Sequence, residues 1–166
     1  MKYTAQQLSD FQCLKDVANR YCRGVDRLDE DLMKSAYWEE ATDDHGFFKG
    51  NAMEFCEICM EVHLAWRSTN HCILNHYIEL DPDGLHARGE IYNVTFLFQK
   101  KAEVLDTWYG RYLDYYEKRG EEWRILERVC VHEGTSTESV NPMDINTELF
   151  RQGSFDRPSK TLKIGP

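Results

Sequence analysis

Apolar residues in the N-terminal part of the chain recur at steps of three and four positions, which is the spacing of an amphipathic helix. The apolar face consists of Leu8, Phe11, Leu14, Ala18, Tyr21 and Val25. Thr4 and Gln7 form a capping-box pattern in front of this segment. We predict a first helix from about Ala5 to Gly24, where the glycine favours the exit turn, so that Asp26 lies just past the helix.

Two further helices are predicted before the pattern changes. Asp29 can cap a short helix that carries Leu32, Met33, Ala36 and Tyr37. Residues 38–50 are predicted as a loop that leads into a short strand over residues 45–50. Asn51 then caps a third helix, from Ala52 to about Trp66, with Phe55, Cys59, Val62 and Trp66 on its apolar side.

From Arg67 onward the apolar residues alternate with a period of two, which indicates strands. The predicted strands cover residues 68–80, 87–99, 105–118 and 122–133, and Pro and Gly residues mark the turns between them. Consecutive long strands form an antiparallel meander, and the preceding helices indicate an α+β fold. Residues 1–134 are therefore expected to form one domain, with residues 135–166 as a C-terminal arm or tail.

Composition restricts the class of protein. A chain of 166 residues with 42% hydrophobic residues fits a single globular domain. The net charge of −9 argues against a nucleic-acid or anionic-membrane partner, because such partners require a concentrated basic surface. The polar N-terminal segment and the absence of a long apolar run predict a cytoplasmic protein without a membrane span.

The cysteines and histidines do not form a recognisable cofactor or metal motif. Six scattered cysteines indicate reduced thiols, and Cys56 and Cys59 form a CxxC pair whose position on an apolar helical face favours core packing over zinc binding. His71 and His76 are separated by an odd number of strand positions, which disfavours a shared metal. Phosphate-binding glycine loops and a GxSxG nucleophile motif are missing, so no cofactor is expected.

Asp26 and His71 are the candidate catalytic pair. A histidine with an ordinary pKa of about 6.5 can accept and return a proton near neutral pH, and a carboxylate on the other ring nitrogen fixes its tautomer. Each residue also has a simpler interpretation, Asp26 as a turn residue and His71 as a hydrogen-bonded strand residue. The residues alone leave both interpretations open.

Spaced motifs over roughly residues 5–133 resemble the SnoaL-like branch of the nuclear-transport-factor-2-like superfamily. The residues that carry the resemblance are Tyr21-Cys22-Arg23-Gly24-Val25-Asp26-Arg27-Leu28-Asp29, Asp44-His45-Gly46 with Gly50, Thr69-Asn70-His71, Gly110-Arg111-Tyr112-Leu113-Asp114 and Trp123-Arg124-Ile125. The resemblance implies a cone-shaped, cystatin-like α+β fold in which helices pack on a strongly curved antiparallel sheet around an internal pocket.

The resemblance also implies roles for single residues. Asp26 and His71 match the catalytic dyad of members that catalyse eliminations, such as scytalone dehydratase, hexachlorocyclohexane dehydrochlorinase and bile-acid dehydratase. Tyr21 matches a polar pocket group and Arg128 a binder of developing negative charge. The remaining predicted pocket residues, assigned to substrate binding, are His132, Tyr112, His45, Trp108 and Tyr92.

The expected function is a cofactor-independent lyase acting on a small hydrophobic substrate that is aromatic or hydroxylated. His71 removes a proton while water, halide or formaldehyde departs. Two alternatives stay open: an isomerase that moves a proton along an enone, and a non-catalytic partner subunit similar to the small subunit of ring-hydroxylating dioxygenases. The many aromatic residues on the strands further predict a homodimer or homotrimer.

Overall fold

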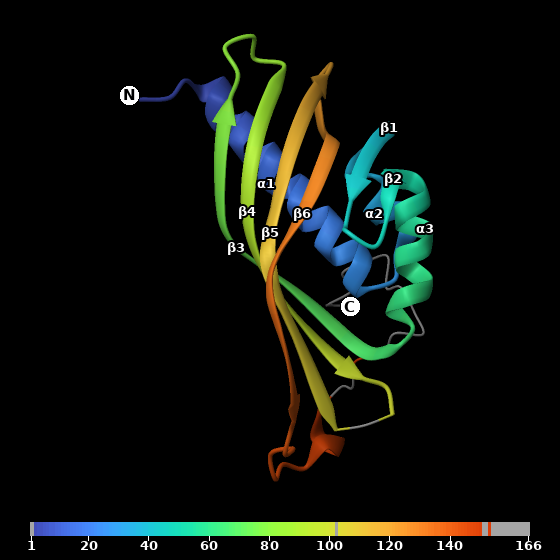
Figure 1. The fold of residues 1–166 in the computed structure, drawn as a ribbon. Coiled ribbons are helices and arrows are strands. Elements are labelled where there is room, and N and C mark those ends of the chain that lie inside the picture. Colours follow the sequence, from blue (N-terminus) through green and yellow to red (C-terminus); the bar gives the residue numbers. More distant parts are fainter. Residues whose placement is uncertain (1, 102, 151–152, 154–166) are drawn as a thin grey trace, which may run out of the picture.

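The computed structural model of this chain describes residues 2–101, 103–150 and 153. Its helices are α1 (Ala5–Asp26), α2 (Glu30–Lys34), α3 (Ala52–His63) and the short 3-10 helix η1 (Thr147–Leu149). Its strands are β1 (Tyr37–Asp44), β2 (Lys49–Asn51), β3 (Trp66–Leu80), β4 (His86–Gln99), β5 (Val104–Arg119) and β6 (Glu122–Ser139). The helices pack against one curved sheet, which confirms the predicted α+β class (Figure 1).

The predicted helix starts are confirmed. Thr4 and Gln7 bond reciprocally as a capping box at α1, and the Asp29 side chain accepts from the backbone of Leu32 at α2. Asn51 caps α3 by accepting from the Met53 amide at 2.8 Å. Helix positions were predictable here because each cap satisfies a free backbone N–H within three residues of itself.

The end of α1 differs from the prediction and matters for the site. The helix continues past Gly24 to Asp26, and the turn is made at Leu28, whose φ is +48°. Gly24 is instead a point of close approach, since a Cβ there would lie 2.5 Å from the backbone nitrogen of Met33 in α2. Asp26 is therefore held on the last turn of a rigid helix rather than on a loop.

The sheet has the order β2-β1-β6-β5-β4-β3. Strands β3 to β6 form the predicted antiparallel meander, but the prediction for residues 38–50 was wrong. Residues 37–44 form strand β1, which pairs in parallel with β6, while the short strand β2 covers only residues 49–51. The polar pair Glu39 and Glu40 obscures the alternation in β1, and its partner strand lies far away in sequence.

The long strands twist sharply near their middles (Figure 1). The pairing register shifts between Ile73 and His76 in β3 and between Tyr109 and Gly110 in β5, as expected for bulges that bend a sheet. Helix α1 contacts β3 and β6, whereas α3 lies beside β1 and β2. The bent sheet and these two helices enclose the space that contains the site.

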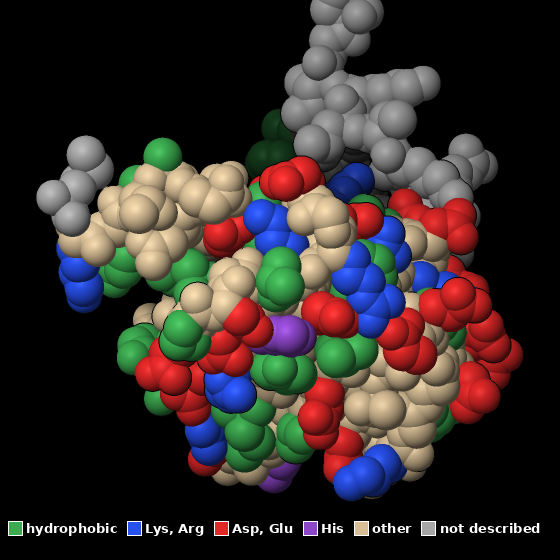
Figure 2. All heavy atoms as spheres, turned by 90° about the horizontal axis from the view of Figure 1, so that it is seen from above, with side chains coloured by type: hydrophobic (Ala, Val, Ile, Leu, Met, Phe, Trp, Pro, Cys, Tyr) green, Lys and Arg blue, Asp and Glu red, His purple; other side chains and the backbone are tan. Residues whose placement is uncertain are grey.

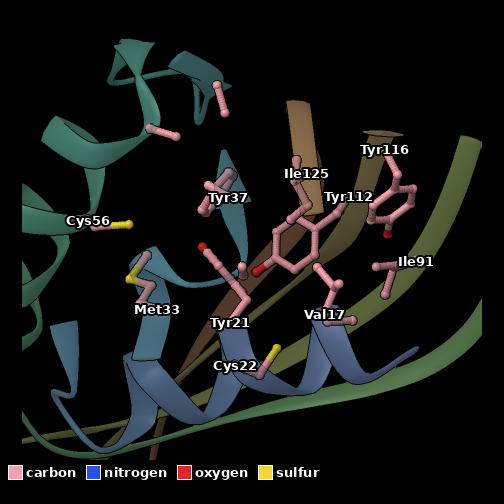
Figure 3. Packing of buried hydrophobic residues seen from close by; sticks show 14 of the residues in the cluster. Val17, Tyr21, Cys22, Met33, Tyr37, Cys56, Ile91, Tyr112, Tyr116 and Ile125 are labelled. Atoms are coloured by element: carbon pink, nitrogen blue, oxygen red, sulfur yellow. The ribbon is translucent and has the colours of Figure 1, made fainter. Parts of the chain in front are cut away.

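The core lies between α1 and the sheet, where Tyr21 of α1 is surrounded by residues from several strands (Figure 3). The ring of Tyr21 meets those of Tyr37 and Tyr112 edge to face, with centroids 5.9 and 5.7 Å apart. Seen from the end that carries the β3–β4 turn, the surface mixes acidic and basic side chains (Figure 2). No helix among the described residues is long and apolar enough to cross a bilayer.

The predicted boundary at residue 134 falls inside a strand, because β6 continues to Ser139. Beyond it, the described part of the predicted C-terminal arm contains η1, and residues 151–152 and 154–166 lie outside the described residues. The function of the arm as a cover for the pocket or a neighbouring subunit stays a prediction.

Candidate active site

Asp26 and His71 are brought together in the structure. The Nδ1 atom of His71 lies 2.7 Å from Oδ1 of Asp26, and the His71 backbone N–H donates to Oδ2 at 2.9 Å. The Thr69 hydroxyl donates to Oδ1 at 2.8 Å. Strand β3 thus presents three donors to one carboxylate at the end of α1, which fixes both the position and the ring orientation of His71.

These contacts keep Asp26 ionised. Burial raises the pKa of its carboxyl, but hydrogen bonds from His71 and Thr69 outweigh burial and hold the pKa below its ordinary value of 3.8. An ionised Asp26 accepts the Nδ1 proton of His71. The Nε2 atom is then the basic nitrogen and has no hydrogen-bond partner among the described residues.

The ring of His71 lines a cavity of about 270 Å³. Its lining consists of Tyr21, His45, Phe47, Phe55, Cys59, Val62, His63, Trp66, His71, Thr95, Leu97, Trp108, Tyr112 and Cys130. His71, Thr95 and Trp108 form one row across β3, β4 and β5, because directly paired residues of neighbouring strands share a face. The volume is slightly below the roughly 300 Å³ at which typical ligand pockets begin, so the cavity suits a small molecule.

Tyr112 lines the cavity, and its hydroxyl oxygen accepts a hydrogen bond. The Asn93 amide donates to the Tyr112 hydroxyl oxygen, so that the hydroxyl hydrogen is directed elsewhere. Burial raises the pKa of Tyr112 and of Tyr21 well above 10, which keeps both phenols protonated. Two neutral phenol groups can therefore donate to an oxyanion in the cavity.

Arg128 is not a wall residue of this cavity. Its guanidinium is fully buried and binds Asp114 through two hydrogen bonds of 2.7 Å. The guanidinium carbon lies 4.2 and 4.3 Å from the ring centroids of Tyr21 and Tyr112. This corrects the expected direct contact with a substrate, because Arg128 places its positive charge behind the two phenols.

Two more predicted pocket residues lie elsewhere. Tyr92 is 44% exposed and lies on the outer face of β4, because it is an odd number of positions from Thr95. His132 is exposed beside Trp108, with ring centroids 6.4 Å apart, and does not line the cavity. The structure thus corrects the placement of both, whereas Tyr21, His45, His71, Trp108 and Tyr112 line the cavity, and Asp26 is bonded to His71 without lining it.

His63 lines the cavity, although no sequence pattern pointed to it. Its Nδ1 atom donates to the Cys59 carbonyl at 2.8 Å, an ordinary bond within α3. Burial, together with the nearby His71 and His45, lowers the pKa of His63 to about 4. Near neutral pH it is a neutral imidazole whose ring centroid lies 5.8 Å from that of His71.

His45 forms a second carboxylate–imidazole pair at the same cavity. Its Nδ1 atom is hydrogen-bonded to Asp43, which also accepts from the Tyr37 hydroxyl at 2.6 Å. Its Nε2 atom lies 3.4 Å from the Tyr21 hydroxyl, and its ring stacks on Phe55 with a centroid distance of 4.2 Å. The sequence pointed to His45 but not to Asp43.

The cavity thiols are poorly suited to nucleophilic attack. Burial raises the pKa of Cys130 to about 12 and that of Cys59 further still, so both stay protonated. Among the described residues, no three His, Cys, Asp or Glu side chains are grouped to hold a metal ion. The chemistry that the site can perform with its own groups is proton transfer.

The fold and site together define a pocketed α+β domain with a histidine–carboxylate pair at the cavity wall. Residues 6–129 match the model of the SnoaL-like domain family. The chain therefore belongs to the SnoaL-like domain family.

Solved structures share the fold at low sequence identity. A candidate scytalone dehydratase from Novosphingobium aromaticivorans is 15% identical, with a TM-score of 0.73 over 87% of this chain and 99% of that one. Hexachlorocyclohexane dehydrochlorinase LinA-type3 from Novosphingobium barchaimii is 17% identical, with a TM-score of 0.73 over 82% and 98%. A candidate aromatic ring hydroxylase from N. aromaticivorans is 18% identical, with a TM-score of 0.70 over 79% and 94%. The comparison with curated proteins gives no match.

Proposed function

We propose that this protein is a cofactor-independent lyase that eliminates a small leaving group from a small, hydrophobic, aromatic or hydroxylated carbonyl compound. The observation that carries the proposal is the geometry of His71, whose Nδ1 atom is held by Asp26 while its Nε2 atom is left for the cavity. The base removes a proton from the carbon next to the carbonyl. A base positioned in this way typically accelerates proton transfer by about 10²–10⁴-fold.

The cavity supports the remaining parts of this reaction. The Tyr112 hydroxyl donates to the oxygen of the enolate that forms, and the buried Arg128 behind its ring favours that negative charge. Phe55, Leu97 and Trp108 supply apolar walls for an aromatic or alicyclic body. The small volume restricts the substrate to a single compact molecule.

The test uses 4-hydroxy-4-phenylbutan-2-one, which loses water to give 4-phenylbut-3-en-2-one, and the non-eliminating ketone 4-phenylbutan-2-one. We expect the wild-type protein to form the enone and to exchange α-protons of the second ketone for deuterium. The His71→Gln variant is expected to lose at least 100-fold in both reactions while unfolding at the wild-type temperature. A folded His71→Gln variant with wild-type rates overturns the proposal.

The same kind of assay distinguishes the lyase from the isomerase and from the non-catalytic subunit. A product of unchanged mass with a shifted double bond, obtained from a β,γ-unsaturated ketone only, favours an isomerase. A wild type that catalyses neither elimination nor exchange favours a non-catalytic partner subunit, which co-purification with a larger iron–sulfur protein then tests.

We further propose that the protein is a homo-oligomer. Several large apolar side chains share the outer face of the sheet and are 38–63% exposed, namely Tyr77, Tyr92, Phe96, Tyr109 and Leu113. A sheet with one open apolar face is expected to be covered by a partner. Sedimentation at micromolar concentration tests this, and a monomer overturns it.

A further inference from the structure

We propose that Asp43 and His45 form a second acid–base pair, which protonates the leaving group, and that the substrate therefore loses water rather than halide. This inference rests on the proposed function and adds the leaving group to it. It starts from the observation that three histidines line one small cavity and that two of them, His71 and His45, are each bonded through Nδ1 to a carboxylate.

The second pair is as well fixed as the first. Asp43 is 1% exposed and lies on β1, where its two donors among the described residues are the Tyr37 hydroxyl and the His45 ring. Among the described residues, Asp43 forms an ion pair only with His45, and Arg128 is its direct partner across the β1–β6 pairing. A buried carboxylate beside an imidazole compensates the positive charge that the ring carries when it is protonated, so this pair can serve as a proton donor as well as a proton acceptor.

The ring of His45 directs its other nitrogen toward the reaction space. The Nε2 atom lies 3.4 Å from the Tyr21 hydroxyl, and both groups line the cavity. The stack on Phe55 at 4.2 Å prevents the ring from rotating away. A protonated His45 can therefore donate either directly to a substrate oxygen or through the Tyr21 hydroxyl.

The two pairs occupy different parts of the wall. His71 lies on β3 beside His63 of α3, whereas His45 follows β1 and packs against Phe55 and Tyr112. The pKa of His63 is lowered by His71 and by His45, because His63 lies near both rings. A substrate that fills the cavity consequently meets a base and an acid at separate points.

Departure of an oxygen group requires such an acid. Bulk water has a pKa of about 15.7, so hydroxide is a poor leaving group and its departure is assisted by a proton. A halide leaves as a stable anion and does not need a proton. A cavity built only for halide loss has no use for a second oriented histidine, so the pair favours a β-hydroxy carbonyl substrate.

The step balances within the cavity. His71 Nε2 takes the α-proton, and the electrons of that C–H bond form the new C=C bond. The C–O bond breaks with its electrons on oxygen, which takes the proton from Nε2 of His45 and leaves as water. His71 ends protonated and His45 neutral, and exchange of one proton with solvent at each residue restores the starting state.

The test compares two reactions in the His45→Gln variant. Deuterium exchange into 4-phenylbutan-2-one needs His71, the folded cavity and the enolate donors but no acid for a leaving group, so we expect it to fall by less than tenfold, through the lost cavity contact of His45. Dehydration of 4-hydroxy-4-phenylbutan-2-one needs the acid as well and is expected to fall by about 10²–10⁴-fold. Retained deuterium exchange also shows that the variant is folded and that His71 is still in place.

A matched control is available on the surface. His86, the first residue of β4, is bonded to Asp83 of the β3–β4 turn with an Nδ1 to Oδ2 distance of 2.6 Å, so His86→Gln removes the same kind of pair away from the cavity. We expect wild-type rates in both reactions from this control.

The outcomes are distinct. Equal loss of exchange and dehydration in His45→Gln means that His45 supports the fold or the base and overturns this inference. Dehydration at the wild-type rate in His45→Gln overturns it too, while the proposed lyase remains if His71→Gln is inactive. A His71→Gln variant that retains both reactions instead refutes the proposed function itself, as does a wild type without activity.

Discussion

The substitution Asp26→Asn tests whether Asp26 orients the His71 ring, because it leaves the His71 side chain itself unchanged. The carboxylate accepts the His71 ring N–H and the Thr69 hydroxyl on one oxygen and the His71 backbone N–H on the other. An amide has one acceptor and one donor end, so it can be placed in two ways. With its NH₂ group toward the His71 backbone, two donors face each other and a buried N–H is left unpaired, at a cost of about 1–3 kcal/mol.

The reverse placement satisfies every group. The amide oxygen then accepts from the backbone N–H, and the NH₂ group donates to the Thr69 oxygen and to Nδ1 of His71. The Nδ1 atom can accept only when the ring proton is on Nε2. We therefore expect the variant to fold with a loss of stability of about 1 kcal/mol, because neutral hydrogen bonds replace stronger bonds to a charged carboxylate, and to contain His71 in the tautomer that cannot act as a base from Nε2.

The expected activity follows from the tautomer. Elimination and deuterium exchange are both predicted to fall by about 10²–10⁴-fold, because both begin with proton removal by Nε2. The measurements are initial rates with the two phenyl ketones, urea unfolding followed by circular dichroism, and nitrogen-15 spectra of the imidazole. Rates within threefold of wild type, or spectra that keep the Nδ1 proton of His71, contradict the orientation by Asp26.

The remaining predictions concern stability and its pH dependence. Thr69→Val removes one of the three bonds to Asp26 and is expected to cost about 1 kcal/mol in urea unfolding and to slow turnover a few-fold; an unchanged midpoint contradicts this. Arg128→Gln leaves the Asp114 carboxylate buried without its cation and is expected to cost roughly 3–5 kcal/mol, whereas a loss below 1 kcal/mol contradicts a structural ion pair. Burial lowers the pKa of His76 from 6.5 to about 4, so the unfolded chain binds more protons between these values, and stability present above pH 6.5 falls by roughly 1–3 kcal/mol toward pH 4. His76→Gln should flatten that decline in unfolding curves at pH 7 and pH 5, and an equally steep decline in the variant refutes the assignment.

Local features of the sequence were sufficient for most of the fold. Caps at Thr4, Asp29 and Asn51 and the change of period after residue 66 depend on neighbours within a few positions, so they can be recognised without the partners. Strand β1 could not be found in this way. Its pairing with β6 joins residues such as Asp43 and Arg128, and its own alternation is weak.

The same distinction between local sequence features and long-range contacts applies to the candidate site. The resemblance paired Asp26 with His71 from spaced motifs, and their contact is now seen. The sequence did not reveal that Arg128 lies behind the phenols, because alternation gives the two faces of a strand but not which one becomes concave.

The sequence by itself determined the helix starts, the meander and the net negative charge, and its resemblance to the SnoaL-like family pointed to the pairing of Asp26 with His71. Only the tertiary structure decided that Asp43 lies beside His45, that His45 lines the same cavity as His71, and that His63 lines its wall. The reason is that burial and proton position depend on which elements pack together, and that packing is set by contacts between residues far apart in the chain.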